Sequence, residues 1–388
     1  MKHIFENTAT AFALKTDSEL ERAYFLFKMI ANEPLVKMGT LMTNFAIKAH
    51  LPVEGLIRAT VFDHFCGGVN EEDCLPVVDK MWGKGVCSVL DYSVEGKETE
   101  ATFDEALHKI LKILTFVKEL DSIPFAVFKP SGFGRFALFQ KVSSNLELTP
   151  EEKVEWERVI ARFDMVCKKA CDMEVALLID GEESWMQNAA DQLVEDMMVK
   201  YNTEKAVVFN TLQMYRWDRL EYLRGLHRRA KEEGFLVGLK VVRGAYLEKE
   251  NTRAKEKGYP SPICASKKDS DINFDKAVSY ILDNLEVISL FCGTHNEASS
   301  YALMELLENK KISKSDSRVW FGQLYGMSDH ISFNLADEGY NVAKYLPFGP
   351  VRDVMPYLIR RAEENTSVAG QTTRELTLLK EERKRRKI

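Results

Sequence analysis

The chain has 388 residues, of which 45% are hydrophobic and 29% are charged, and this composition is typical of a folded protein with a large core. Its formal net charge is -6 and its basic residues cluster only near the C-terminus, which argues against a nucleic-acid-binding surface. The seven cysteines include no C-x-x-C pair, so neither a disulfide framework nor a zinc site is predicted.

Residues 1–85 are expected to form a helical arm or cap. Apolar residues recur near i, i+3 and i+4 in segments that begin at Ser18, Leu35 and Glu71. The first residues include several acids and no apolar run, unlike a secretory signal or a transit peptide. No stretch approaches the roughly 18 apolar residues that a membrane-spanning helix needs. We therefore expect a cytoplasmic protein without a targeting peptide, in which any contact with the inner face of the cell membrane is peripheral.

After residue 85, short apolar segments alternate with amphipathic stretches of helical length. The apolar segments span residues 86–95, 123–132, 173–183, 205–215, 235–246, 288–296, 318–327 and 342–349. Near-continuous apolar runs are typical of strands buried on both faces, and repeated strand–helix units form parallel sheets. Eight such units predict an α/β fold, a TIM-type (β/α)8 barrel over residues 86–370, followed by a basic tail over residues 371–388.

An open, doubly wound sheet is the competing architecture. When it binds a dinucleotide, such a sheet normally carries a G-x-G-x-x-G turn. The nearest approach is PSGFGRF around Gly132 and Gly134, which has the wrong spacing and no acidic residue at the expected distance. We interpret this segment as a loop after the second strand, and the barrel is favoured.

Polar residues lie where the predicted strands end, and barrel enzymes carry their chemistry at those ends. They are Asp91, Glu95, Lys129, Asp180, Asn210, Gln213, Lys240, Arg243, Thr294, His295, Gln323 and Tyr345. Any one of them alone is more typical of a solvated group or a structural ion pair. Together they predict a mouth lined for a polar ligand. No combination of Asp and His has the spacing of metal ligands on one element, so we predict no metal.

The last predicted helix of the barrel carries a polar stripe. Tyr357, Arg360, Arg361 and Glu364 lie at i, i+3, i+4 and i+7, and so share one face. A solvated polar face is the commoner meaning of such a stripe. However, this helix follows the eighth strand, where barrels commonly bind anions, and paired arginines suit a carboxylate. We therefore prefer an anionic group facing the arginine pair.

Five segments together resemble the proline dehydrogenase family: LLIDGEE, VVRGAYLEKE, CGTHNE, LYGM and YLPFGPVRDVMPYLIRRAEEN. The resemblance extends over roughly residues 88–367, and its pattern is closest to the monofunctional, mitochondrial type. It implies a barrel with bound FAD, hydride transfer from L-proline to the flavin, release of 1-pyrroline-5-carboxylate, and a membrane quinone as the electron acceptor. This reaction is the first step of proline degradation to glutamate.

The resemblance also implies roles for individual residues. Asp180 and Lys240 are the catalytic candidates, with Asp180 shaping the pocket and orienting its neighbours. Substrate binding is implied for Lys129, Arg360 and Arg361 at the carboxylate and for Tyr345 and Tyr357 at the ring. Cofactor binding is implied for Gly181, Asn210, Lys240, Arg243, Gly244, Ala245, Tyr246, Thr294, His295 and Glu364. Bifunctional bacterial members have Arg where Lys240 stands and Trp where Leu247 stands, which puts flavin tuning and adenine stacking in doubt.

Alternative functions remain open at this level. Hydroxyproline-oxidising relatives have a smaller residue at the position of Tyr345, so proline is the favoured substrate. A lyase that forms a Schiff base on Lys129 or Lys240 is a second class, and a barrel without catalysis is a third. The basic tail is more typical of a solvated, partly disordered end than of an element that attaches the protein to an anionic membrane surface.

Overall fold

The computed structural model describes residues 3–32, 54–93, 98–367 and 371–388, together with positions 34, 36 and 39. The side chains at 56, 59 and 362–371 lie outside this description. Most of the predicted helix that begins at Leu35 therefore falls outside the described residues.

Eight parallel strands form the centre of the fold. They are β1 (Val86–Tyr92), β2 (Phe125–Phe128), β3 (Ala176–Ile179), β4 (Val208–Gln213), β5 (Val237–Val242), β6 (Ile288–Gly293), β7 (Val319–Leu324) and β8 (Val342–Phe348). The strands close into a barrel in chain order, and β1 pairs with β8 from Val86 opposite Val342 to Tyr92 opposite Phe348. The predicted (β/α)8 barrel is confirmed, and each strand lies inside its predicted segment.

Helices separate the strands along the chain. Before β1 stand η1 (Ile4–Glu6), α1 (Thr8–Ala11), α2 (Asp17–Ile30), α4 (Glu54–Ile57), the π-helical η2 (Arg58–Phe62), α5 (Asp63–Phe65) and α6 (Glu71–Trp82). Between β1 and β4 stand α7 (Glu100–Val117), η3 (Pro130–Gly132), α8 (Phe136–Ser143), α9 (Pro150–Met173) and α10 (Ser184–Tyr201). The later helices are α11 (Arg219–Glu233), α12 (Leu247–Lys257), α13 (Lys267–Leu282), α14 (Glu297–Asn309), α15 (Asp329–Asp337), α16 (Met355–Ser367) and α17 (Gln371–Arg386).

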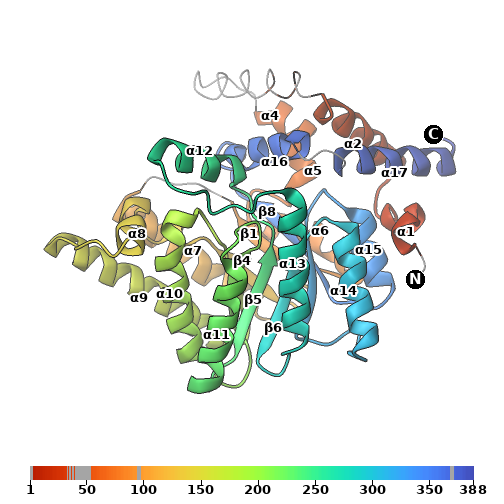
Figure 1. Ribbon diagram of the computed structural model, residues 1–388. Coiled ribbons are helices and arrows are strands. Elements are labelled where there is room, and N and C mark those ends of the chain that lie inside the picture. Colours follow the sequence, from red (N-terminus) through yellow and green to blue (C-terminus); the bar gives the residue numbers. More distant parts are fainter. Residues whose placement is uncertain are drawn as a thin grey trace. The chain divides into compact units, whose positions relative to one another are not determined.

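The chain divides into two compact units, which are residues 1–95 with 322–388, and residues 96–321. In the second unit, α10 packs on β4, α11 packs on β5, and α13 packs on β5 and β6 (Figure 1). The strands are almost wholly buried: β3 is entirely apolar, and all six residues of β4 are buried although three of them, Asn210, Thr211 and Gln213, are polar. This packing holds the ends of β2 to β6, and the residues that follow them, in fixed positions.

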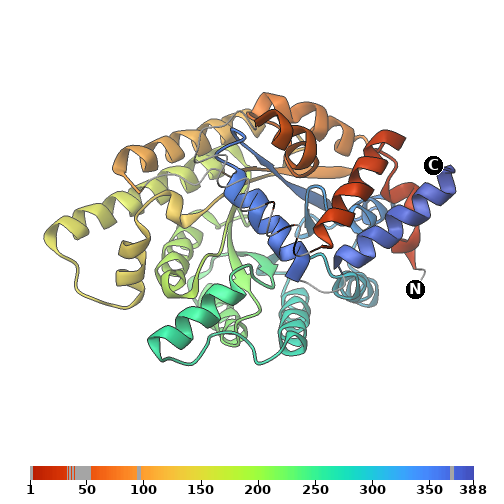
Figure 2. The same cartoon turned by 90° about the horizontal axis from the view of Figure 1, so that it is seen from above.

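The C-terminal segment differs from the solvated, partly disordered end that its composition favoured. Residues 371–386 form α17, which runs beside α2 (Figure 2). Leu378 and Leu379 are fully buried in a cluster with Leu20 and Phe27 of α2. The helix is ordered because its apolar face has a partner, and that partner lies about 350 residues away in the sequence.

Candidate functional site

Three of the predicted site residues meet at the strand ends of the second unit. Lys129 follows β2, Asp180 follows β3, and Lys240 lies in β5. The Lys240 ammonium donates to Asp180 Oδ1, and the Lys129 ammonium lies 3.9 Å from Asp180 Oδ2. The side chain of Lys240 is 7% exposed and that of Asp180 is 17% exposed, so solvent screens this pair poorly. The Asp180 carboxylate thus lies between two ammonium groups, one in direct hydrogen-bond contact and one at the outer limit of an ion pair.

A fourth charged group lies beside these three, and the sequence interpretation did not assign it a role. Glu182 accepts hydrogen bonds from Ser131 N at 2.8 Å and from Ser131 Oγ at 2.6 Å. Burial raises the pKa of Glu182 to about 7, although the Ser131 hydrogen bonds and the charge of Lys129 act in the opposite direction. The sequence could have pointed to Glu182, because it lies in the segment LLIDGEE, two residues after Asp180.

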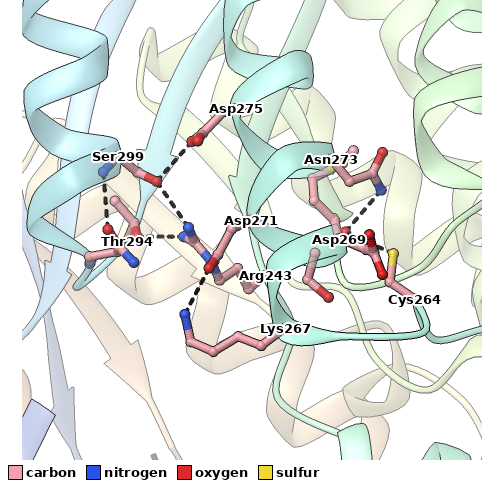
Figure 3. A network of polar contacts seen from close by, with 12 residues as sticks. Arg243, Cys264, Lys267, Asp269, Asp271, Asn273, Asp275, Thr294 and Ser299 are labelled. Carbon is pink, nitrogen blue, oxygen red and sulfur yellow. Dashed lines mark hydrogen bonds and ion pairs between the residues drawn. The ribbon is translucent and has the colours of Figure 1, made fainter. Parts of the chain in front are cut away.

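Arg243 and Thr294 form part of a polar network at the ends of β5 and β6. The Arg243 guanidinium donates to Asp271 at 2.6 Å, to Thr294 Oγ1 at 3.0 Å and to Ser299 Oγ at 2.9 Å (Figure 3). It also lies 4.4 Å from the centroid of the Phe274 ring. These contacts fix the guanidinium and link β5 to α13 and α14. His295 follows Thr294 and is half-buried.

The turn after β5 contains Gly244, Ala245 and Tyr246. Gly244 has a φ of +130°, and a Cβ placed on it would lie 2.5 Å from the ring of Tyr215. The structure gives two reasons for a glycine here: the backbone conformation is unfavourable for residues with a side chain, and the Tyr215 ring occupies the space where a Cβ would lie. Ala245 is exposed and Tyr246 is half-buried.

Two amide side chains of β4 have different surroundings. Gln213 lies against Gly181 and donates to the carbonyl oxygen of Glu182 at 2.6 Å. Asn210 donates instead to Asp191 of α10 at 2.8 Å and to the Tyr222 hydroxyl of α11 at 3.1 Å. Asn210 therefore faces the surrounding helices, whereas Gln213 lies at the strand end. Both amides were predicted to lie at the end of this strand, but only Asn210 was predicted to bind the cofactor.

The remaining predicted residues belong to the first unit. Tyr345 lies in β8, is 8% exposed, and its carbonyl oxygen accepts a hydrogen bond from Tyr325 N at 2.8 Å. In α16, Tyr357 is buried with Leu358 in one hydrophobic cluster, and the Arg361 guanidinium lies 5.3 Å from the Tyr357 ring centroid. Arg360 is half-buried. The side chain of Glu364 lies outside the described residues.

Within the described part of the chain, no group of three or more His, Cys, Asp or Glu side chains has an arrangement that could hold a metal ion. No described helix combines the length and the apolar character that crossing a bilayer requires.

Comparison with known proteins gives consistent matches. The sequence profile of the family "Proline dehydrogenase" matches residues 74–374. Protein CarD of carbapenem antibiotics biosynthesis from Pectobacterium carotovorum subsp. carotovorum is 37% identical over 364 residues, which are 93% of this chain and 94% of CarD. Mitochondrial proline dehydrogenase 1 of Homo sapiens is 39% identical over 234 residues, which are 60% of this chain and 39% of the human protein.

A solved structure gives the same fold. Proline utilization A from Bdellovibrio bacteriovorus, inactivated by N-propargylglycine, superposes with a TM-score of 0.74 at 21% sequence identity, and the match covers 95% of this chain and 40% of that protein. The chain thus spans well under half of the human enzyme and of this larger protein. The family profile covers more than three quarters of the chain, and the chain belongs to the proline dehydrogenase family.

Proposed function

We propose that this protein oxidises L-proline to (S)-1-pyrroline-5-carboxylate, with FAD as the hydride acceptor and a quinone as the final electron acceptor. The observation that carries the proposal is the group of Lys129, Asp180 and Lys240 at the strand ends, because the family profile covers all three residues. In the family setting, this reaction is the first step of proline degradation to glutamate.

The substrate assignments rest on charge and shape. Lys129 supplies a positive charge next to Asp180, and we assign it to the substrate carboxylate. We assign the same carboxylate to Arg360 and Arg361 of α16, since guanidinium groups bind carboxylates through two parallel hydrogen bonds. Tyr345 and Tyr357 are buried aromatic side chains and are assigned to the pyrrolidine ring. With Tyr345 at this position, proline is favoured over hydroxyproline.

The residues present also suit FAD. Lys240 is a buried ammonium at a strand end, where it would place positive charge beside the isoalloxazine ring. We assign contacts with the cofactor to Gly181, Asn210, Arg243, Gly244, Ala245, Tyr246, Thr294, His295 and Glu364. For Asn210, whose side chain faces α10 and α11, the structure supports an indirect contribution through the position of β4. Gln213 is the amide of that strand that reaches the strand end.

Chemically, FAD supplies the hydride acceptor. The protein's own contribution is to hold the substrate carboxylate by charge-assisted hydrogen bonds and to present the ring carbon next to nitrogen in one orientation. Asp180 acts on this arrangement through the two lysines that it holds. It keeps their ammonium groups in place before the substrate arrives, so no reorganisation is needed on binding.

The colour of the purified protein tests the proposal. Protein that binds FAD is yellow, and anaerobic addition of L-proline should bleach it as the flavin accepts hydride. Trans-4-hydroxy-L-proline serves as the competing substrate and should bleach it far more slowly. A colourless protein that cannot be reconstituted with FAD would contradict the proposal.

A lysine-dependent lyase is less consistent with the contacts. The Lys240 amine is engaged by Asp180, and an amine held in an ion pair is a poor nucleophile. Borohydride trapping in the presence of 2-oxo acids, whose ketone carbonyl can condense with a lysine amine, should therefore leave no covalent adduct on Lys240 or Lys129.

The similarity to CarD favours a second metabolic role for the same oxidation, in biosynthesis instead of degradation. CarD is named for carbapenem antibiotics biosynthesis, and it matches almost the whole of this chain. Loss of growth on proline as the sole nitrogen source after gene disruption would support the degradative setting. Unchanged growth together with loss of a carbapenem product would support the biosynthetic one.

We also propose a cytoplasmic protein that contacts the inner face of the membrane, where the quinone resides. The C-terminal segment is the candidate for that contact because it is basic. However, several basic side chains of this segment already form ion pairs within the protein. Arg383 pairs with Glu21 at 2.5 Å, and Arg385 and Arg386 both pair with the buried carboxylate of Glu382 at 2.7 Å.

A further inference from the structure

The backbone of Glu182 is held by hydrogen bonds at both its N–H and its carbonyl oxygen. Its backbone N–H donates to Gln187 Oε1 at 2.9 Å, and its carbonyl oxygen accepts from Gln213 Nε2 at 2.6 Å. Gln187 lies in α10 and in turn donates to Asp191 at 2.9 Å. The backbone of Glu182 is therefore attached both to the neighbouring strand β4 and to helix α10, and its side chain extends from a rigid support.

The side chain of Glu182 binds the turn that follows Lys129. Ser131 offers its N–H and its hydroxyl to the two carboxylate oxygens, at 2.8 Å and 2.6 Å. The turn itself, η3, is closed by the hydrogen bond from Gly132 N to Lys129 O at 2.9 Å. Lys129 and Ser131 thus belong to one closed turn. A group that fixes Ser131 also fixes the backbone from which the Lys129 side chain extends.

We propose that Glu182 is a positioning residue that holds Lys129 in place through Ser131 and so sets the affinity for the substrate carboxylate. This inference rests on the proposed function, because Lys129 is assigned to the substrate there. No contact with substrate or cofactor is assigned to Glu182 itself. Its effect should therefore appear mainly in KM and only weakly in kcat.

The buried position of Glu182 adds a dependence on pH. The groups that act on it are Ser131 in η3, Lys129 before that turn, and Glu183 next to it in the chain. Since burial raises its pKa to about 7, the carboxylate loses its charge as the pH falls through neutrality. A protonated carboxyl is a weaker acceptor for the Ser131 N–H, so KM for proline should rise as the pH falls through about 7.

Two variants test the role. In Glu182→Ala, both hydrogen bonds to Ser131 are lost, and we expect KM for proline to rise about tenfold while kcat stays within about threefold. Glu182→Gln keeps the shape and removes the charge, so its KM should be raised by a smaller factor and should no longer change near pH 7. A kcat that falls more than KM rises, or an unchanged pH profile in Glu182→Gln, would overturn the proposal.

Hydrogen exchange at the Ser131 amide gives a readout that does not depend on catalysis. In both variants, this amide should exchange faster than in the wild-type holoenzyme, because its acceptor is lost or weakened. Glu250→Gln is a matched control, since Glu250 is fully buried and binds Ser184 N and Oγ in the same two-pronged way, each at 2.6 Å. That control should speed exchange at Ser184 and leave Ser131 unchanged.

A Lys129→Met variant distinguishes a failure of the substrate assignment of Lys129 from a failure of the positioning role of Glu182. If Lys129→Met leaves KM for proline unchanged, the substrate assignment of Lys129 fails, whatever Glu182 does. If Lys129→Met raises KM but Ser131 exchange is the same in wild type and Glu182→Ala, the positioning role of Glu182 fails and the substrate assignment stands.

Discussion

Replacing Asp180 with asparagine removes the carboxylate on which the proposed site depends. The change is nearly isosteric, and it leaves the ammonium of Lys240, whose side chain is 7% exposed, without its charged partner. It also removes the charge that lies 3.9 Å from the Lys129 ammonium. A charge-assisted hydrogen bond contributes about 1.5–3 kcal/mol, which corresponds to a decrease of roughly 10- to 100-fold in kcat/KM.

Anaerobic stopped-flow absorbance with increasing L-proline would measure the expected decrease, since it follows flavin bleaching directly. A thermal unfolding scan of the same sample shows whether Asp180→Asn is folded and retains FAD. Asp164→Asn is the control. Its carboxylate pairs with the 55% exposed side chain of Lys200, and exposed pairs contribute little. If folded, FAD-loaded Asp180→Asn reduces its flavin within about twofold of wild type, the assigned role of Asp180 is refuted.

Three further predictions concern other parts of the chain. Arg361→Met should lower kcat/KM about 10- to 100-fold by removing one charged contact with the substrate carboxylate, and unchanged kinetics would remove Arg361 from the carboxylate site. Asp329→Asn should lower the free energy of unfolding by about 3–5 kcal/mol, measured by urea denaturation, because Lys344 is fully buried and lies 2.9 Å from Asp329. Burial would raise the pKa of Asp329, but Lys344 and Lys15 outweigh it and hold that pKa far below its usual range, so the wild type should lose this stability as the pH falls below about 4 while the variant does not. Truncation at Lys380 should weaken binding to anionic liposomes only slightly, because Arg383, Arg385 and Arg386 are already in ion pairs, and a complete loss would contradict this expectation and make the tail the anchor.

The sequence by itself determined the barrel and the family. Strands buried on both faces must be apolar over nearly their whole length, so β3 and β5 are visible without knowledge of their neighbours. The strand ends were equally visible, because polar residues such as Asp180 and Arg243 follow these runs directly. Lys129, Asp180 and Lys240 could be chosen as candidates because strand ends in a parallel barrel share one edge.

The contacts of the candidate residues required the tertiary structure. The partner of Asp180 is Lys240, 60 residues later in the chain, and the partner of Glu182 is Ser131, 51 residues earlier. No local pattern records such pairs, since hydrophobic periodicity specifies only which face of an element is buried. The same limit explains Asn210, whose strand was predicted correctly but whose side chain turned out to face α10 and α11.

Contacts between residues far apart in the sequence also determine the structure of the C-terminal segment, which packs against α2 near the N-terminus. By composition alone, residues 371–388 are typical of a solvated end, because basic residues dominate the last third of the segment. Only the folded chain brings Leu378 and Leu379 against α2 and pairs Arg383 with Glu21. The sequence thus specified which segments are strands and helices through local apolar spacing. The tertiary structure decided which charges are paired and which turn Glu182 holds, because those free energies depend on distances between residues that are far apart in the chain.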